Sequence, residues 1–178
     1  MSGYRKEGAS GDREGEVSLR PMEAGDTPLI VKWRNNPRVR ANFVYREIFT
    51  PETHERWIRE HIEGARDVVQ WIIRLADRPV GSVYFRDIDR QTRRAEYGIF
   101  LGEDDAVGRG IGNTAIELAL RCAAEELGLK HIVLRVFSDN VPAIRSYEHA
   151  GFRVTKVMPA VRCSDGEEGE MLFMERDL

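Results

Sequence analysis

The sequence predicts an α/β protein in which one mixed, mostly antiparallel sheet is flanked by helices. The chain has 178 residues, of which 42% are hydrophobic, and this is enough to bury one core. Three strand-like runs between residues 68 and 101 follow one another across short polar turns, which is typical of an antiparallel meander. A long helical pattern then separates the last run from a further strand, and a connection of that length favours a parallel pair.

The domain is expected to begin near residue 17. Residues 1–16 contain four glycines among charged residues and almost no apolar side chain. Such a segment buries too little surface to offset the entropy lost on ordering. The sequence therefore predicts a flexible leader at 1–16 and a single domain over 17–178.

The first elements are a short strand and two helices. Val17–Arg20 predicts a strand that ends at Pro21. Asp26 is the expected N-cap of a helix that ends before Asn35, and Thr50, followed by a proline, is the expected cap of a second helix. The inward face of the second helix is expected to hold His54, Trp57, Ile58, His61 and Ile62.

The remaining pattern alternates strands and helices. In chain order, the sequence predicts strands at 68–75, 80–85 and 95–101, a helix at 110–127 that ends at Gly128, a strand at 131–137, a helix at 141–150, and two terminal strands on either side of an acidic turn at 164–169.

Charge and residue spacing argue against several classes of function. Lys and Arg (27) are interleaved with Asp and Glu (30), so no general nucleic-acid-binding surface is predicted. No apolar run approaches the roughly 20 residues of a membrane span, and no secretory signal is recognised. Cys122 and Cys163 lack metal or redox spacing and are expected to be reduced thiols of a cytoplasmic protein. His54 and His61 would lie about 10 Å apart on one helix, too far for one metal ion.

The segment Val107–Thr114 places three glycines on alternate residues before the longest helical pattern. Glycine takes positive φ and has no Cβ, so this loop can turn backbone N–H groups toward an anion, and the helix dipole adds to the attraction. The loop is not a Walker A motif, and a dinucleotide site would have its glycines after the first strand of a βαβ unit. On this loop alone, a phosphate site and an ordinary tight turn remain equally open.

A second motif lies about thirty residues further along the chain. The positions Asn140, Ala143, Tyr147, Gly151 and Phe152 resemble the Asn-x-x-Ala-x-x-x-Tyr-x-x-x-Gly-Phe segment of the GNAT superfamily of acyl-CoA-dependent N-acetyltransferases. The glycine loop resembles the CoA pyrophosphate loop of the same superfamily. Leu19-Arg20-Pro21, Trp33-Arg34-Asn35 and 95–102 resemble the branch that acetylates ribosomal-protein N-termini, spermidine and nucleotide-linked amino sugars.

The resemblance implies a GNAT fold, with the sheet splayed between its fourth and fifth strands and the pantetheine arm of acetyl-CoA in the gap. Amides of the arm would pair with the free strand edge at Ile99, Phe100 and Leu101. The residues implied for the pyrophosphate are Gly108, Arg109, Gly110, Ile111, Gly112 and Asn113, with the Thr114 hydroxyl as a further donor. The Asn140 side chain would touch the arm as well as cap its helix.

The loop departs from the family pattern at Val107. In that pattern an Arg or Gln stands three residues before the Gly-x-Gly pair formed here by Gly110 and Gly112. We expect weaker side-chain support without loss of CoA binding, since the backbone carries most of the contact, and Arg109 is the residue expected to compensate.

Tyr147 and Glu96 are the catalytic candidates. Tyr147 matches the family's tyrosine beside the sulfur, and a phenol of pKa about 10 can return a proton to a thiolate whose thiol has a pKa of about 8.5. Deprotonating a lysine-like amine at pH 7 costs roughly 4–5 kcal/mol, so a base is useful, and Glu96 borders the implied gap. The alternatives are a core role for Tyr147 and, for Glu96, an ion pair with Arg94 or another surface cation.

The acceptor is predicted only by class. A small primary amine is expected, and Trp33-Arg34-Asn35 with the arginines that follow favours a nucleotide-linked amino sugar over a polyamine, because arginines suit a phosphate-bearing substrate. A ribosomal-protein N-terminus is the alternative acceptor. Residues 45–47 are further candidates for acceptor contacts, whereas Trp33 and Trp57 are expected in the core.

The predicted activity is therefore acetyl transfer to a primary amine by direct attack in a ternary complex, without a metal. A homodimer is a common form of related proteins. Two other classes of function remain open: a non-catalytic acyl-CoA-binding module, and a nucleotide-binding switch protein.

Overall fold

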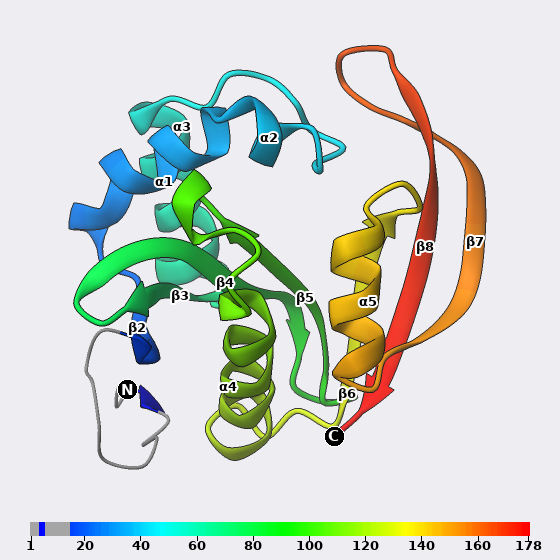
Figure 1. Ribbon diagram of the computed structural model, residues 1–178. Coiled ribbons are helices and arrows are strands. Elements are labelled where there is room, and N and C mark those ends of the chain that lie inside the picture. The colour runs from blue at the N-terminus through cyan, green and yellow to red at the C-terminus, as the bar shows by residue number, and fades with distance from the viewer. Residues whose placement is uncertain (1–3, 6–14) are drawn as a thin grey trace.

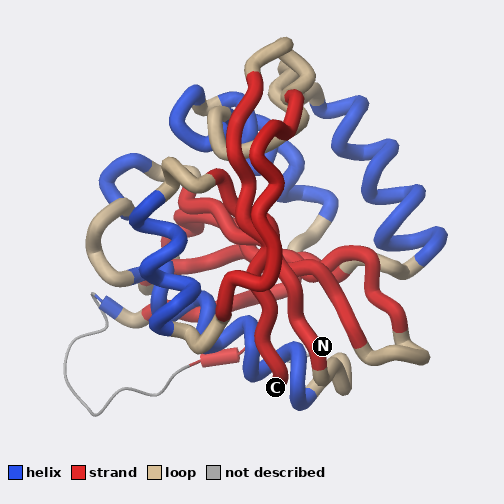
Figure 2. Tube along the Cα trace, turned by 90° about the vertical axis from the view of Figure 1, so that its right-hand side faces the viewer, coloured by secondary structure: helices blue, strands red, loops and turns tan. Residues whose placement is uncertain are grey.

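The computed structural model describes residues 4–5 and 15–178, and these form one sheet with helices on both faces (Figures 1 and 2). The strands are β1 (Tyr4–Arg5), β2 (Val17–Pro21), β3 (Val69–Leu75), β4 (Arg78–Asp89), β5 (Arg94–Leu101), β6 (His131–Phe137), β7 (Arg153–Arg162) and β8 (Glu168–Asp177). Their order in the sheet is β1-β2-β3-β4-β5-β6-β8-β7. All neighbours are antiparallel except β5 and β6, so the predicted mixed sheet is confirmed.

Most of the expected flexible leader, at residues 1–3 and 6–14, lies outside the described residues. The remaining part differs from the prediction, because Tyr4–Arg5 forms β1. This two-residue strand pairs with Ser18 and Leu19 of β2. An unpaired edge strand offers a row of free N–H and C=O groups, which even a polar segment can use.

The helices are α1 (Thr27–Asn35), α2 (Pro37–Arg40), α3 (Pro51–Trp57), α4 (Ile111–Glu125) and α5 (Val141–His149). A π-helical segment, Ile58–Ala65, continues α3. Helix α2 was not predicted, because Asn36 and Pro37 mark the start of a new helix as well as the end of α1.

Asp26 occupies the N-cap position of α1, as predicted, but its side chain makes no capping bond to that helix. Its carboxylate instead accepts hydrogen bonds from the Arg20 guanidinium, at 2.6 and 2.7 Å, and from the Glu23 N–H, at 2.8 Å. An arginine fork is a stronger partner for a carboxylate than a single N–H group, so Asp26 ties β2 to the turn before α1.

The two faces of the sheet carry different layers. The apolar side of α4, including Ala115, Leu118 and Ala119, packs on one face against side chains such as Val83 and Tyr97. A smaller cluster covers the other face under α1 and α2, and its buried members are Ile30, Trp33, Val39, Ile72 and Phe100. Figure 1 shows α4 and α5 side by side along the opening between β5 and β6.

The opening exists because β5 and β6 pair over a short stretch only. Arg94–Glu96 pairs with His131–Val133, and beyond Glu96 the two strands separate. The other edge of β5 stays paired with β4 as far as Leu101. The splay predicted between the strands at 95–101 and 131–137 is therefore present.

Gly102 lies where β5 leaves the sheet beneath the Trp33 indole. A Cβ at Gly102 would lie 1.9 Å from Trp33 Cγ and 2.1 Å from Cδ1. Trp33 is fully buried, and its Nε1 donates a 2.8 Å hydrogen bond to Glu103. The indole therefore packs directly on the Gly102 backbone and leaves no room for a side chain at this position.

Both cysteines, Cys122 and Cys163, are buried free thiols. None of the helices in the described residues has the length and apolar composition needed to cross a membrane.

His54 of α3 is buried, and its burial predicts that the protein loses stability in mild acid. Nδ1 shares a 2.9 Å hydrogen bond with the Thr27 hydroxyl, and Nε2 is buried without a partner among the described residues. Burial lowers the pKa of His54 to about 4, although the charge of Asp26 opposes this. Between that value and about 6.5 the unfolded chain binds more protons than the folded one, so stability falls as pH drops through this window.

We expect the wild type to lose about 2–3 kcal/mol more than His54→Gln between pH 7.5 and pH 4.5, because glutamine does not titrate. Urea unfolding at both pH values measures the difference. Equal losses in the two proteins would show that His54 is not the titrating group.

Candidate active site

The glycine loop ends at α4 with backbone donors that no side chain caps. Gly108 and Gly110 both have φ of +76°, and a Cβ at either would meet nothing within 4 Å. Gly110 is the N-cap of α4, and Thr114 donates to its carbonyl. The N–H groups of the intervening residues precede that first intrahelical bond, so they are available to an anion in the open space beside the loop.

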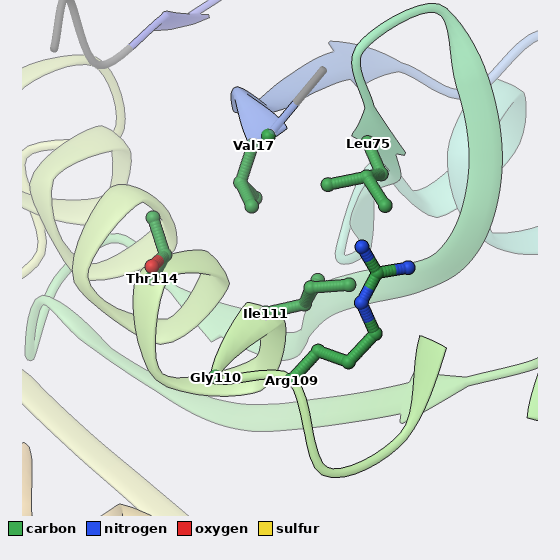
Figure 3. Close-up of a pocket in the computed structure, with 7 residues that line it drawn as sticks. Val17, Leu75, Arg109, Gly110, Ile111 and Thr114 are labelled. Carbon is green, nitrogen blue, oxygen red and sulfur yellow. The ribbon is translucent and has the colours of Figure 1, made fainter. Parts of the chain in front are cut away.

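A pocket of about 230 Å³ lies beside this loop (Figure 3). It is lined by Gly15, Val17, Leu75, Arg109, Gly110, Ile111 and Thr114. The Arg109 side chain runs toward Leu75 at the end of β3, whereas the Val107 side chain is 46% exposed. Arg109 thus supplies a cation next to the loop, on the side of β2 and β3.

The free edge of β5 continues the same site toward the centre of the sheet. Ile99, Phe100 and Leu101 pair with β4 on one side, and β5 has no pairing with β6 beyond Glu96. The Leu101 carbonyl accepts a 3.0 Å hydrogen bond from Arg38 Nη2, and the edge before it is open to an extended ligand that adds to the strand.

Asn140 holds two structural contacts at the other side of the opening. Its Oδ1 caps α5 by accepting from the Ala143 N–H, as the sequence predicts, and its Nδ2 donates to Asn42 Oδ1 at 2.9 Å. The second bond joins α5 to the segment that follows α2.

Tyr147 of α5 is buried next to Tyr97 of β5. The two ring centroids lie 6.3 Å apart in an edge-to-face contact, and Phe152 packs 6.0 Å from Tyr147. Burial raises the pKa of Tyr147 well above its usual range, so the phenol keeps its proton at neutral pH. The Tyr97 hydroxyl is buried with no partner in the part of the chain that is described.

Glu96 lies at the point where β5 and β6 separate, and it is held by two arginines. Its Oε1 accepts from Arg86 Nη2 at 2.5 Å and from Arg135 Nε at 3.1 Å. The alternative of an ion pair with Arg94 or another surface cation is therefore present in its second form, with Arg86 of β4 and Arg135 of β6 as the cations. Arg86 stands opposite Glu96 in the β4–β5 register, a neighbour that a meander prediction could have found.

The same sheet face carries two further side chains that the sequence analysis did not place. Tyr84, opposite Gly98 on β5, lies against the glycine so closely that a Cβ there would be 2.1 Å from its Cζ. Arg34 of α1 stacks on Phe43, with 3.4 Å from Cζ to the ring centroid. Alternation along β4 places Tyr84 and Arg86 on one face, but nothing local brings Arg34 to it.

The segment after α2 reaches across the opening to the hairpin tip of β7 and β8. The Arg46 N–H donates to Ser164 Oγ, the Ser164 N–H donates to Val44, and the Arg46 guanidinium pairs with Asp165 at 3.2 Å. Tyr45 is exposed and bonds to Glu47. Arg46 and the acidic turn are thus engaged with each other rather than free for an acceptor.

Within the described residues, no group of three or more His, Cys, Asp or Glu is arranged to hold a metal ion.

Comparisons of the sequence and of the structure with known proteins indicate the same family. Residues 16–153 match the family model described as "Acetyltransferase (GNAT) domain". An uncharacterised protein of Methanocaldococcus jannaschii is 29% identical over 165 residues, which is 90% of this chain but 31% of that protein, so the chain spans about a third of its length. The spermidine N(1)-acetyltransferase of Vibrio cholerae is 26% identical over 138 residues, 77% of this chain and 79% of that one.

A solved structure shares the fold. The crystal structure of spermidine N-acetyltransferase from Vibrio cholerae in complex with CoA and spermine has a TM-score of 0.84 and 23% identity, covering 90% of this chain and 95% of that chain.

Proposed function

The chain belongs to the GNAT acetyltransferase family, and on that premise we propose that it transfers the acetyl group of acetyl-CoA to a primary amine by direct attack in a ternary complex. One observation carries the proposal: the uncapped N-terminus of α4 and its open glycine loop lie at one end of a strand edge that β6 leaves unpaired. An anionic end and an extended amide-bearing arm fit these two surfaces in that order.

The residues that would hold acetyl-CoA are those of the loop and of the β5 edge. The donors for the pyrophosphate are the backbone N–H groups from Gly108 to Asn113, with Thr114 and Arg109 beside them, and the arm would lie along Ile99–Leu101. Acetyl-CoA supplies the acetyl group as a thioester. Asn140 is expected to face the arm while it continues to cap α5.

Tyr147 is the proposed acid. Its buried phenol keeps its proton at neutral pH and lies on the α4–α5 side of the sheet, where the sulfur of the bound thioester is expected. Glu96 is the proposed base on the opposite face, at the point where the strands separate. Two arginines fix its carboxylate in place, which orients it toward an amine or an intervening water.

Replacing Glu96 by glutamine tests whether Glu96 acts as a base or only as a structural partner of the arginines. We expect kcat/KM for the acceptor to fall about 100-fold at pH 7, because a general base contributes roughly 10²–10⁴. The loss should shrink at pH 9–10, where more of the amine is already deprotonated. Initial rates across pH measure this, with the exposed carboxylate variant Asp77→Asn as a control that keeps the wild-type profile. A loss that is equal at all pH values would leave Glu96 only the role of holding Arg86 and Arg135.

The proposed acceptor is a small molecule such as a nucleotide-linked amino sugar or a polyamine. A ribosomal-protein N-terminus is the alternative. The relative from Vibrio cholerae was solved with spermine, and a second structure of that protein is dodecameric; assembly of this chain as a homodimer remains a prediction.

The test is a panel of amines with acetyl-CoA, monitored by release of free thiol. Spermidine, a nucleotide-linked amino sugar, an aminoglycoside and a short N-terminal peptide represent the classes. Thermal stabilisation by acetyl-CoA without thiol release from any amine would favour a non-catalytic binding module. Equal stabilisation by ATP and acetyl-CoA would favour a nucleotide-binding switch.

A further inference from the structure

Arg34 is a cation without a counterion. In the described part of the chain its guanidinium makes no hydrogen bond or ion pair, and Nη1 is fully buried without a partner. Other arginines of this region lie against aspartates, in the pairs Arg20–Asp26, Arg38–Asp104, Arg46–Asp165 and Arg78–Asp105. Arg34 is partly buried, and a guanidinium nitrogen that is buried without a partner is costly unless an anion binds it.

The surroundings of Arg34 increase this cost. Its planar group is held over the Phe43 ring, and Phe49 lies 5.4 Å from its Cζ, so aromatic faces fix the orientation. Burial lowers its pKa to about 10; Tyr84 opposes this shift, and the positive charge of Arg86 adds to it. The charged side chain that acts on the pKa of Arg34 is thus another cation and not a carboxylate.

The face beneath Arg34 has more positive than negative charge. Arg86 and Arg135 share the single carboxylate Glu96, and Arg86 has in addition the exposed Asp87 at 3.9 Å from its Nε. Arg86 Nε itself is buried and makes no hydrogen bond within residues 4–5 and 15–178. Three guanidinium groups therefore face two carboxylates, and the uncompensated charge is centred on Arg34.

This charge lies beside the place where the acceptor is expected. Tyr84 is influenced electrostatically by Arg34, Arg86 and Glu96 alike, so its phenol lies among them. The Tyr84–Gly98 pair is two residues along the strands from the Arg86–Glu96 pair, which corresponds to about 7 Å. A small molecule whose amine lies near Glu96 would extend past Tyr84 in the direction of Arg34.

We propose that the acceptor carries an anionic group, a phosphate or a carboxylate, which Arg34 binds while the amine faces the opening between β5 and β6. This inference rests on the proposed acetyl transfer and defines its substrate class. A polycation such as spermidine would place further positive charge beside three arginines, so it is excluded as the preferred acceptor.

Matched amines test the proposal. Glucosamine 6-phosphate is compared with glucosamine, and 4-aminobutyrate with butylamine, because each pair differs mainly in the anionic group; spermidine is the polycation. We expect kcat/KM of the wild type to be about 10- to 100-fold higher for the anionic member of at least one pair, the range that a charge-assisted hydrogen bond gives. The pair that responds identifies phosphate or carboxylate.

Variants assign the preference to Arg34. Arg34→Met should abolish it while leaving the rate with the neutral amine within about twofold, and the melting temperature should be unchanged or higher because an unpaired charge is removed. Arg38→Met is the matched control, since Arg38 already has Asp104 as partner, and it should keep the preference. Arg34→Lys keeps the charge without the planar fork and should retain part of the preference.

Some results would overturn the proposal. The proposal is rejected if the wild type acetylates spermidine or the neutral amines as well as the anionic ones, or if Arg34→Met lowers the rates with all amines equally. Failure of the acetyl transfer itself has a different signature, in which acetyl-CoA binds but no amine releases thiol. Thermal stabilisation by glucosamine 6-phosphate but not glucosamine, lost in Arg34→Met, would then still support the anion site, and equal stabilisation by both sugars would reject it.

Discussion

Replacing Tyr147 by phenylalanine is expected to lower kcat about 100-fold or more while acetyl-CoA affinity stays within about twofold, because a positioned general acid contributes roughly 10²–10⁴. The phenol is buried with its pKa raised, so it holds a proton that phenylalanine cannot supply. The ring contacts with Tyr97 and Phe152 are retained in the variant, and little stability should be lost. Thiol release under saturating substrates measures kcat, and calorimetric titration measures acetyl-CoA binding.

Tyr97→Phe is the matched control. It removes a second buried phenol 6.3 Å away, one whose hydroxyl has no partner among the described residues. Removing an unsatisfied hydroxyl costs no hydrogen bond, so stability should hold or improve and the rate should stay near that of the wild type. If Tyr147→Phe keeps the full rate with every accepted amine, the acid role is wrong.

Gly102→Ala is expected to destabilise the protein by about 3 kcal/mol or more, at the upper end of what overpacking costs. The new Cβ would lie 1.9 Å from Trp33 Cγ, and the fully buried indole has no solvent to move into. For a chain of this size the loss corresponds to a fall in melting temperature of roughly 6–12 °C. Thermal and urea unfolding measure it.

Gly25→Ala is the control for this prediction, since a Cβ at Gly25 meets nothing within 4 Å and its backbone is not in the left-handed region. We expect its stability to change by no more than about 0.5 kcal/mol. A Gly102→Ala protein as stable as this control would mean that β5 and α1 can separate at little cost.

The fold was predictable where neighbours in sequence are also neighbours in space. The meander from β3 to β5 and the crossover through α4 follow from local periodicity and connection length. Gly110 begins α4 and Gly151 follows the end of α5, and both have positive φ. Asp26 shows the limit of such reasoning. Its local pattern predicts a helix cap, but Arg20, brought close by folding, binds it more strongly.

The site was predictable in part for the same reason. The loop and the α5 motif are contiguous segments, whereas the environment of Glu96 comes from β4 and β6, and that of Arg34 from α1, the following loop and the sheet. The pairing of Arg86 with Glu96 could have been predicted by aligning the two neighbouring strands of the meander. The contact between Arg34 and Phe43 depends on α2, where the sequence predicts only the end of the preceding helix.

The opening between β5 and β6 is fastened at both ends. At one end the strands share the Arg94–Glu96 ladder, and at the other Val44 and Arg46 are bonded to Ser164 of the β7–β8 hairpin. The two parts of the sheet are therefore joined on both sides of the unpaired stretch, so they are held in place rather than free to swing apart. In the proposed reaction, acetyl-CoA and the amine approach this stretch from opposite faces of the sheet, so neither has to leave before the other enters.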